Sequence, residues 1–321
     1  MSLEQFVNKV KNAVCAYFGE ELRITVQKIM KNNGIEMTGL IFMEKGSDIA
    51  ATIYLDSYYE EYEEGMPLGE VVRMLIRAYE EHRPAEKLNL DFFRDYEQVR
   101  TRLACRLVNL EKNRDLLEQV PHQVWLDLAV VPCCILMGDE LGCACILIRY
   151  VHMRRWNVGE EELLAEARAN MQQILRPECV PMKNFLYEMM RHAVAQQLPE
   201  AEPGKEAEQE ELLDKVAGLL VSRREADGKE MFILSNTQHF YGAAVLLYPD
   251  VLKLLVGNKR GFFILPSSVH EVLLLADTGG ERRFDLYQMV NEVNERNVPP
   301  EEFLSDSVYY FDRKEGRVRI L

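Results

Sequence analysis

Two strand-like runs joined by a tight-turn sequence decide the class of fold: RITVQKIM, residues 23–30, and IEMTGLIFM, residues 35–43, separated by KNNG, residues 31–34. The apolar residues switch here to a two-residue period, which is typical of strands. Asn and Gly tolerate the positive φ of a tight turn, so the NNG sequence indicates a β-hairpin. An amphipathic helix over residues 2–18, with Ser2 and Gln5 as a capping box, precedes the hairpin. The segment therefore predicts a helix packed on an antiparallel pair of strands.

Strands and helices continue to alternate along the chain. Further helices are predicted over residues 58–64, 69–82, 113–120, 157–175 (capped by Asn157), 185–197, 242–255 and 286–297. Further strands are predicted over residues 49–55, 124–137, 143–151, 231–235, 262–265, 269–275, 307–312 and 317–321. Residues 90–109 fit a helix and a strand equally well. This order predicts an α+β protein with two domains, whose mixed or antiparallel sheets pack against helices.

The chain length of 321 residues favours two domains, because domains average about 150 residues. The segment 198–211 contains two prolines, one glycine and six glutamates, and it offers no residues for a core. We therefore expect an N-terminal α+β domain over 1–198, an acidic linker or exposed loop over 199–211, and a C-terminal α+β domain over 212–321.

The charge of the chain limits its partners. Asp and Glu outnumber Lys and Arg by 52 to 38, which gives a formal charge of −14. An acidic surface disfavours nucleic acid and anionic lipid, because both are attracted by Lys and Arg. The N-terminus lacks the features of a signal peptide, and the longest uncharged apolar run, 128–137, is half of the ~20 residues that a membrane helix needs. Seven cysteines, an odd number, fit reduced thiols, so we expect a cytoplasmic protein.

Four cysteines near the second hairpin resemble a zinc set: Cys133, Cys134, Cys143 and Cys145. Adjacent residues on a strand point to opposite faces, so at most three of these thiols can converge, and we expect them to fill the core. The sequence also lacks a His-Glu-x-x-His motif, a phosphate-binding loop, a dinucleotide-binding glycine motif and a nucleophile elbow. We therefore expect no metal site and no cofactor.

The densest polar cluster is LPSSVHE, residues 265–271. Ser268 and His270 are two residues apart, so on a strand they share a face and offer a nucleophile and a base, whereas Glu271 points to the other face. The simpler interpretation is a turn whose hydroxyls cap backbone groups, followed by a structural histidine.

A second polar patch, Ser235-Asn236-Thr237, follows a predicted strand and precedes the predicted helix at Gly242. A helix N-terminus attracts anions, so Asn236, His239 and Gly242 are candidate ligand-binding residues. They would converge with His270 if their two strands are neighbours. The simpler interpretation is that Asn236 forms a turn or cap.

Asp127 stands alone in an apolar run, and a buried carboxylate needs a partner. Arg149 on the neighbouring predicted strand is one candidate, which would make a structural ion pair.

Several blocks of the sequence resemble an uncharacterised bacterial family, a domain of unknown function common in Gram-positive anaerobes of the gut. The blocks are PHQVWLDLAVV (121–131), WNV (156–158), LSN (234–236), YGAA (241–244), ILPSSVHE (264–271) and LSDSVYY (304–310). The resemblance implies a bacterial cytoplasmic protein and brings no activity, cofactor or catalytic residue with it.

Together these features favour a non-enzymatic protein-interaction or regulatory module that binds a protein partner. One alternative is a hydrolase-like enzyme that uses Ser268 and His270, with Asn236 or Glu271 in support. Another is a binding site for a small anionic ligand near Asn236 and Gly242. The sequence leaves the oligomeric state open.

Overall fold

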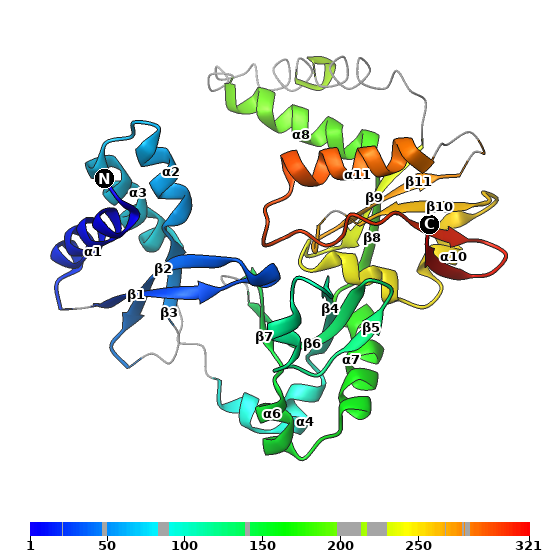
Figure 1. Ribbon diagram of the computed structural model, residues 1–321, viewed down its shortest axis with the longest axis horizontal. Helices are drawn as coiled ribbons and strands as arrows, with labels where there is room; N and C mark the ends of the chain where they lie inside the picture. Colours follow the sequence, from blue (N-terminus) through cyan, green and yellow to red (C-terminus); the bar gives the residue numbers. More distant parts are fainter. Residues whose placement is uncertain are drawn as a thin grey trace, which may run out of the picture.

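A computed structural model describes residues 1–20, 22–46, 50–82, 90–138, 142–197, 213–216, 230–266, 268–277, 279 and 283–321. Its strands form three sheets in which every pair is antiparallel, with helices packed on them (Figure 1). The α+β class is therefore confirmed. The acidic segment 199–211 lies outside the described residues, and the division into two domains there stays a prediction.

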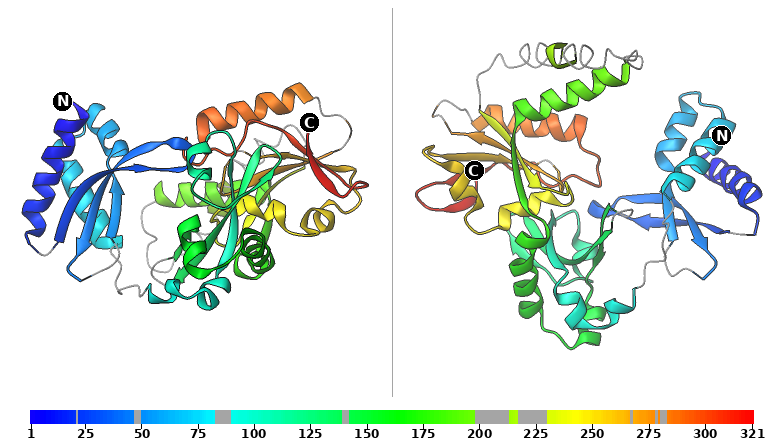
Figure 2. Two further views of the ribbon diagram at one scale, coloured as in Figure 1. Left: turned by 60° about the horizontal axis from the view of Figure 1, so that its bottom comes forward. Right: turned by 180° about the vertical axis from the view of Figure 1, so that it is seen from behind.

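The first sheet contains the hairpin that the sequence predicts. Its strands are β1 (Leu22–Met30), β2 (Glu36–Glu44) and β3 (Ala50–Tyr54), and its helices are α1 (Leu3–Phe18), α2 (Asp56–Glu63) and α3 (Leu68–His82). Helix α1 begins with the predicted capping box of Ser2 and Gln5. The three helices and three strands enclose a hydrophobic cluster of their own, which includes Phe6, Val10, Leu40, Phe42, Leu55 and Leu75. Residues 1–82 thus form a separate packed unit (Figure 2).

The second sheet has the order β4 (Leu103–Asn109), β6 (Leu128–Gly138), β5 (Gln123–Trp125), with β7 (Gly142–Leu147) also paired to β6. Its helices are η2 (Asp91–Arg94), α4 (Tyr96–Arg100), α5 (Arg114–Leu117), α6 (Tyr150–Trp156) and α7 (Glu160–Ile174). The single strand predicted over 124–137 is wrong, because the chain reverses at Leu126 and Asp127 and pairs Trp125 with Leu128. The predicted cap is also wrong, since Asn157 adopts φ 54° and ends α6, whereas Gly159 begins α7.

The third sheet has the order β13 (Arg317–Ile320), β12 (Tyr309–Asp312), β10 (Gly261–Leu265), β11 (Val272–Ala276), β9 (Met231–Asn236), β8 (Pro177–Pro181). Its helices are α8 (Met182–Gln197), η3 (Gly242–Leu247), α10 (Val251–Val256) and α11 (Arg283–Asn297). The helix predicted over 242–255 is broken, because Asp250 has φ 62° and separates the 3-10 helix η3 from α10. Strand β8 precedes the 199–211 segment and β9 follows it, so the sheet takes strands from both sides.

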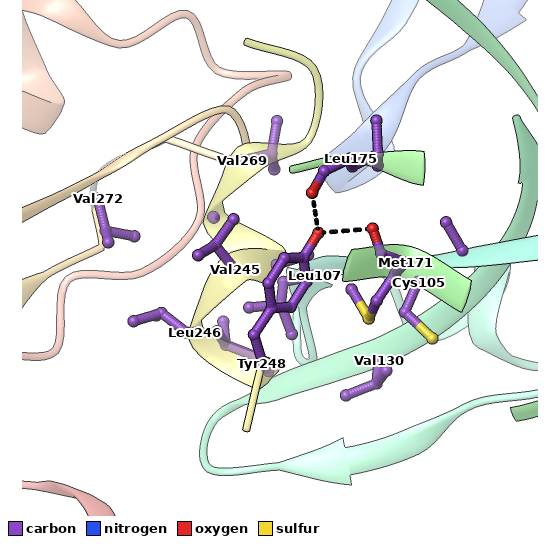
Figure 3. Packing of buried hydrophobic residues seen from close by; sticks show 14 of the residues in the cluster. Cys105, Leu107, Val130, Met171, Leu175, Val245, Leu246, Tyr248, Val269 and Val272 are labelled. Atoms are coloured by element: carbon purple, nitrogen blue, oxygen red, sulfur yellow. Dashed lines mark hydrogen bonds between the residues drawn. The ribbon is translucent and has the colours of Figure 1, made fainter. Parts of the chain in front are cut away.

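A common hydrophobic core joins the second and third sheets. Figure 3 shows its centre, where Tyr248 lies between η3 and the end of α7. The Tyr248 hydroxyl is 3.1 Å from the carbonyl oxygen of Met171 and 2.6 Å from that of Leu175. Because this cluster contains residues from both sheets, including Leu107, Val130, Val245 and Val272, the two sheets pack as one body.

Candidate functional site

The tight turn between β5 and β6 positions a carboxylate. Leu126 has φ 58° in this turn, a backbone conformation that bulky side chains rarely adopt. Such conformations persist only where the surrounding structure holds them, and they are frequent at functional sites. The turn presents Asp127 to the segment 303–309, which leads into β12.

Three hydroxyl groups from that segment donate hydrogen bonds to Asp127. Ser305 Oγ lies 2.6 Å from Oδ2 and Ser307 Oγ lies 2.9 Å from it, while the Tyr309 hydroxyl donates to Oδ1. Burial, together with the Asp127 charge, raises the pKa of Tyr309 well above its usual value, so this phenol remains a donor. The predicted partner of Asp127 is therefore wrong: Arg149 bonds to Gln119 instead.

Asp127 keeps both an uncompensated charge and a free acceptor position. An ionised carboxylate accepts about four hydrogen bonds, and the three hydroxyls use three of them. In the part of the chain that the structure describes, no Lys, Arg or His lies within ion-pair distance of Asp127. The side chain is only partly buried and lines a cleft. A donor that carries a positive charge would therefore complete its coordination.

The cleft beside Asp127 has a volume of about 930 Å³. One wall is the turn Asn109–Arg114, and the other includes Phe303 and the segment 305–307. Four acidic side chains line it (Glu111, Glu118, Asp127 and Asp306) against two basic ones (Lys112 and Arg114), so its formal charge is −2. Leu110, Leu117 and Phe303 add apolar surface. The cleft therefore suits a cationic ligand with an apolar stem.

The β1–β2 hairpin holds both walls of this cleft. Asn33, at the tip, accepts a bond of 2.8 Å from Asn113 Nδ2 on one wall, and its own amide is 2.9 Å from Asn113 Oδ1. On the other wall Asn33 Nδ2 donates to the carbonyl oxygens of Pro300 (2.9 Å) and Phe303 (2.7 Å). Asn33 adopts φ 62°, a conformation that Asn tolerates better than most residues. Residues 1–82 are thus connected to the cleft through the side chains of Asn33 and of Asn32, whose Nδ2 donates to the Glu301 carbonyl oxygen at 2.9 Å.

The structure does not bring Ser268 and His270 together as a nucleophile and a base. The Ser268 hydroxyl accepts the backbone amide of His270 at 3.1 Å, which is a turn interaction. The imidazole stacks on Tyr241, and its Nδ1 accepts the Tyr241 amide at 3.3 Å. Its Nε2 lies 3.8 Å from Glu302, so Glu302 and not Glu271 is the carboxylate beside it. Among the described residues no hydrogen bond joins the Ser268 hydroxyl to the imidazole.

The polar side chains of Ser235 and Asn236 are hydrogen-bonded to backbone groups of the protein. The sequence left open whether the two strands are neighbours; β9 pairs with β11, and Ser235 Oγ donates to the His270 carbonyl oxygen at 2.7 Å. Asn236 uses its side chain in a turn, with Oδ1 accepting the amides of Gln238 and Phe240. His239 is exposed, 3.4 Å from Glu178.

Gly242 lies in close contact with neighbouring groups at the start of η3. A Cβ on Gly242 would overlap Ser235 Oγ and the His270 carbonyl oxygen. The following amide, that of Ala243, already donates to the Val269 carbonyl oxygen at 3.2 Å. The Ala243 amide at the start of η3 is therefore already paired.

The thiols follow the predicted strand geometry. The pairing of β6 with β7 places Cys133, Cys143 and Cys145 on one face of the sheet and Cys134 on the other. Within the residues that the structure describes, no three His, Cys, Asp or Glu side chains gather in a way that could hold a metal ion.

The fold and site define an α+β protein with three antiparallel sheets and an acidic cleft between two of them. The chain belongs to a family of unknown function, DUF5688, whose model matches residues 3–313. No curated protein and no solved structure gives a match to the chain. Over the described ranges, no helix combines the length and apolar character that crossing a membrane requires.

Sequence reasoning found Asp127 but missed the three hydroxyls that bind it. Ser305, Ser307 and Tyr309 recur at every second position, which places them on one side of an extended segment. That spacing, together with a lone carboxylate in an apolar run, was the only available signal.

Proposed function

We propose that the protein is a non-enzymatic interaction module that binds a basic segment of a partner protein, with a lysine side chain inserted into the cleft at Asp127. The observation that carries this proposal is the Asp127 carboxylate, which has three hydroxyl donors, a free acceptor position and no cation beside it among the described residues. The hydroxyls occupy most of its lone pairs, which makes it a poor general base and disfavours catalysis.

The geometry favours lysine over arginine. A lysine ammonium is a compact charge that needs a single acceptor to be oriented, whereas the arginine fork pairs best with two free carboxylate acceptors. Only one acceptor position of Asp127 remains. One wall of the cleft already accommodates a lysine ammonium, since that of Lys112 lies 3.8 Å from the Phe303 ring centroid.

The hairpin contacts give the module a means of regulation. Asn33 bonds to both walls of the cleft, so a partner that changes the spacing of the walls also strains or relieves these bonds. Binding and the position of residues 1–82 would then be thermodynamically coupled.

A lysine-centred peptide library tests this function. Peptides with a fixed central lysine and randomised flanks are passed over the immobilised full chain, beside a matched library that carries acetyl-lysine. Enriched peptides are then measured by fluorescence anisotropy against the wild type, Asp127→Asn and Glu20→Gln. Glu20 is exposed in the first unit, so Glu20→Gln makes the same change in net charge far from the cleft.

We expect enrichment only from the lysine library. Asp127→Asn should weaken binding by about tenfold or more, which corresponds to about 1.4 kcal/mol, and Glu20→Gln should bind as the wild type does. Equal enrichment from both libraries would show that the lysine charge is not recognised. Equal affinities for the two variants would show that peptides bind through a general attraction to an acidic protein.

We further infer a bacterial cytoplasmic location for the protein. The seven cysteines are all free in the structure, which supports a reducing compartment. The family resemblance to bacterial sequences supports the source.

A further inference from the structure

A buried arginine lies between the second sheet and η3 without a carboxylate partner. Arg106, on β4, is 8% exposed. Its Nη1 donates to the Tyr241 hydroxyl at 2.9 Å, and its guanidinium carbon lies 5.0 Å from the centroid of the same ring. Its Nε has no hydrogen-bond partner, and no Asp or Glu in the described part of the chain forms an ion pair with it. A buried cation of this kind requires a counter-charge.

Two thiols face this arginine. In the antiparallel register, Arg106 on β4 is opposite Val131 on β6. Cys133 follows Val131 by two residues, so the side chains of Arg106 and Cys133 lie on the same face of the sheet. Cys145, opposite Ile135, lies on the same face and diagonally across from Cys133. Cys145 interacts with the Cys133 thiol and with the Tyr241 hydroxyl.

These contacts separate the two thiols chemically. The hydrogen bond from Cys133, then the charge of Arg106 and the bond from Tyr241, lower the pKa of Cys145 to about 7. Donating that bond, together with burial, raises the pKa of Cys133. Burial raises the pKa of Cys143, two residues from Cys145 on the same strand, to about 11. Above about pH 7, a thiolate on Cys145 therefore supplies the counter-charge that Arg106 otherwise lacks.

We propose that Cys145 and Cys133 form a peroxide-sensitive thiol pair, in which Cys145 is the attacking sulfur and Cys133 the resolving one. The Cys145 thiolate attacks one oxygen of hydrogen peroxide; an S–O bond forms, the O–O bond breaks and hydroxide leaves, so sulfur is oxidised to a sulfenic acid. The Cys133 sulfur then attacks Cys145; an S–S bond forms, the S–O bond breaks, and the hydroxyl leaves with the Cys133 proton as water.

Oxidation would act on the joint between the two sheets. Disulfide formation removes the thiolate charge and leaves Arg106 buried with only the Tyr241 hydroxyl and ring. Tyr241 immediately precedes η3, whose residues belong to the common core, and its ring stacks on His270 at 5.5 Å. The oxidised protein should therefore open more readily at the contact between β4 and η3.

The test uses the reduced full chain and three variants, Cys145→Ser, Cys133→Ser and Cys143→Ser. Alkylation by iodoacetamide is followed by mass spectrometry across pH, and oxidation is started with stoichiometric hydrogen peroxide. After denaturation, a glutamate-specific protease cleaves after Glu140 and separates Cys133 from Cys145. Trypsin would leave both cysteines in one peptide. Cys143→Ser is the matched control, since it removes a neighbouring thiol from the same face of the same strand.

We expect Cys145 to alkylate with a midpoint near pH 7 and, at pH 7, on the order of 100-fold faster than Cys143. Peroxide should join the two peptides through Cys133 and Cys145 in the wild type and in Cys143→Ser. In Cys133→Ser the sulfenic acid should persist on Cys145 and be trapped by dimedone, and in Cys145→Ser neither product should form. Alkylation of Cys145 no faster than that of Cys143, or a disulfide that uses Cys143 or Cys134 instead, would overturn the proposal.

Discussion

Removing the Asp127 carboxylate tests whether it organises the segment 303–309. In Asp127→Ala the three hydroxyls lose their acceptor. Ser305 is 1% exposed and Tyr309 is 0% exposed, so neither can turn to water, whereas Ser307 is partly exposed and can. An unpaired buried hydroxyl costs about 1–3 kcal/mol, so the two together predict a loss of about 2–6 kcal/mol in unfolding free energy.

Urea unfolding followed by tryptophan fluorescence measures this loss. Both tryptophans lie in the body formed by the second and third sheets, and Trp125 packs on Tyr309 with ring centroids 6.1 Å apart. Asp127→Asn keeps an acceptor oxygen, so its free energy of unfolding should lie between that of the wild type and that of Asp127→Ala. Asp306→Ala is the control, because Asp306 is an exposed neighbour and its loss should cost less than about 1 kcal/mol. A loss below about 0.5 kcal/mol for Asp127→Ala would refute the reasoning.

Three further predictions concern other parts of the molecule. Asn33→Gly keeps the positive φ but loses the side-chain bonds to both walls, so amide exchange in the segment 298–304 should accelerate; unchanged exchange would mean that the hairpin does not restrain the cleft. Gly242→Ala forces a Cβ into Ser235 Oγ and a carbonyl oxygen, and it should cost about 2 kcal/mol or more in urea unfolding, while a neutral effect would show that η3 can shift. Because the pKa of Cys145 is lowered to about 7 in the folded chain, the unfolding free energy of the wild type relative to that of Cys145→Ser should rise between pH 7 and pH 8 by up to about 1.4 kcal/mol. Burial raises the pKa of thiols such as Cys105 and Cys134, which lowers the stability of both proteins alike at higher pH. An equal slope in both proteins would contradict the lowered pKa of Cys145.

The parts of the fold that rest on local signals were predictable. The first hairpin follows from the NNG turn and the alternation on both sides of it, and the structure pairs Arg23 with Met43 through to Met30 with Glu36. The break between β5 and β6 was not predictable, because the turn places Leu126 at a positive φ where Asn or Gly would be the recognisable residue. By contrast, the break in the helix before Asp250 was predictable, because Pro249 stands inside the predicted helix 242–255 and lacks the amide that a helix interior requires.

The candidate site was predictable only in part. Asp127 stood out because an apolar run rarely contains an unpaired carboxylate, but its partner Ser305 is 178 residues away. Sequence spacing favours close partners such as Arg149, and only the packing of the two sheets selects the distant one. The sequence around Ser268 and His270 is compatible with a catalytic dyad and with a turn. The structure distinguishes them, because the Ser268 hydroxyl accepts a hydrogen bond from the backbone amide of His270 and not from the imidazole.

Hydrogen–deuterium exchange with and without a lysine-centred peptide tests the central claim most directly, namely that the cleft at Asp127 receives a cationic side chain. We predict that peptide binding slows exchange in the two walls together, at 109–114 and at 303–307, and that Asp127→Asn abolishes both effects. Protection confined to other surfaces, or protection in the walls that persists in Asp127→Asn, would contradict the account.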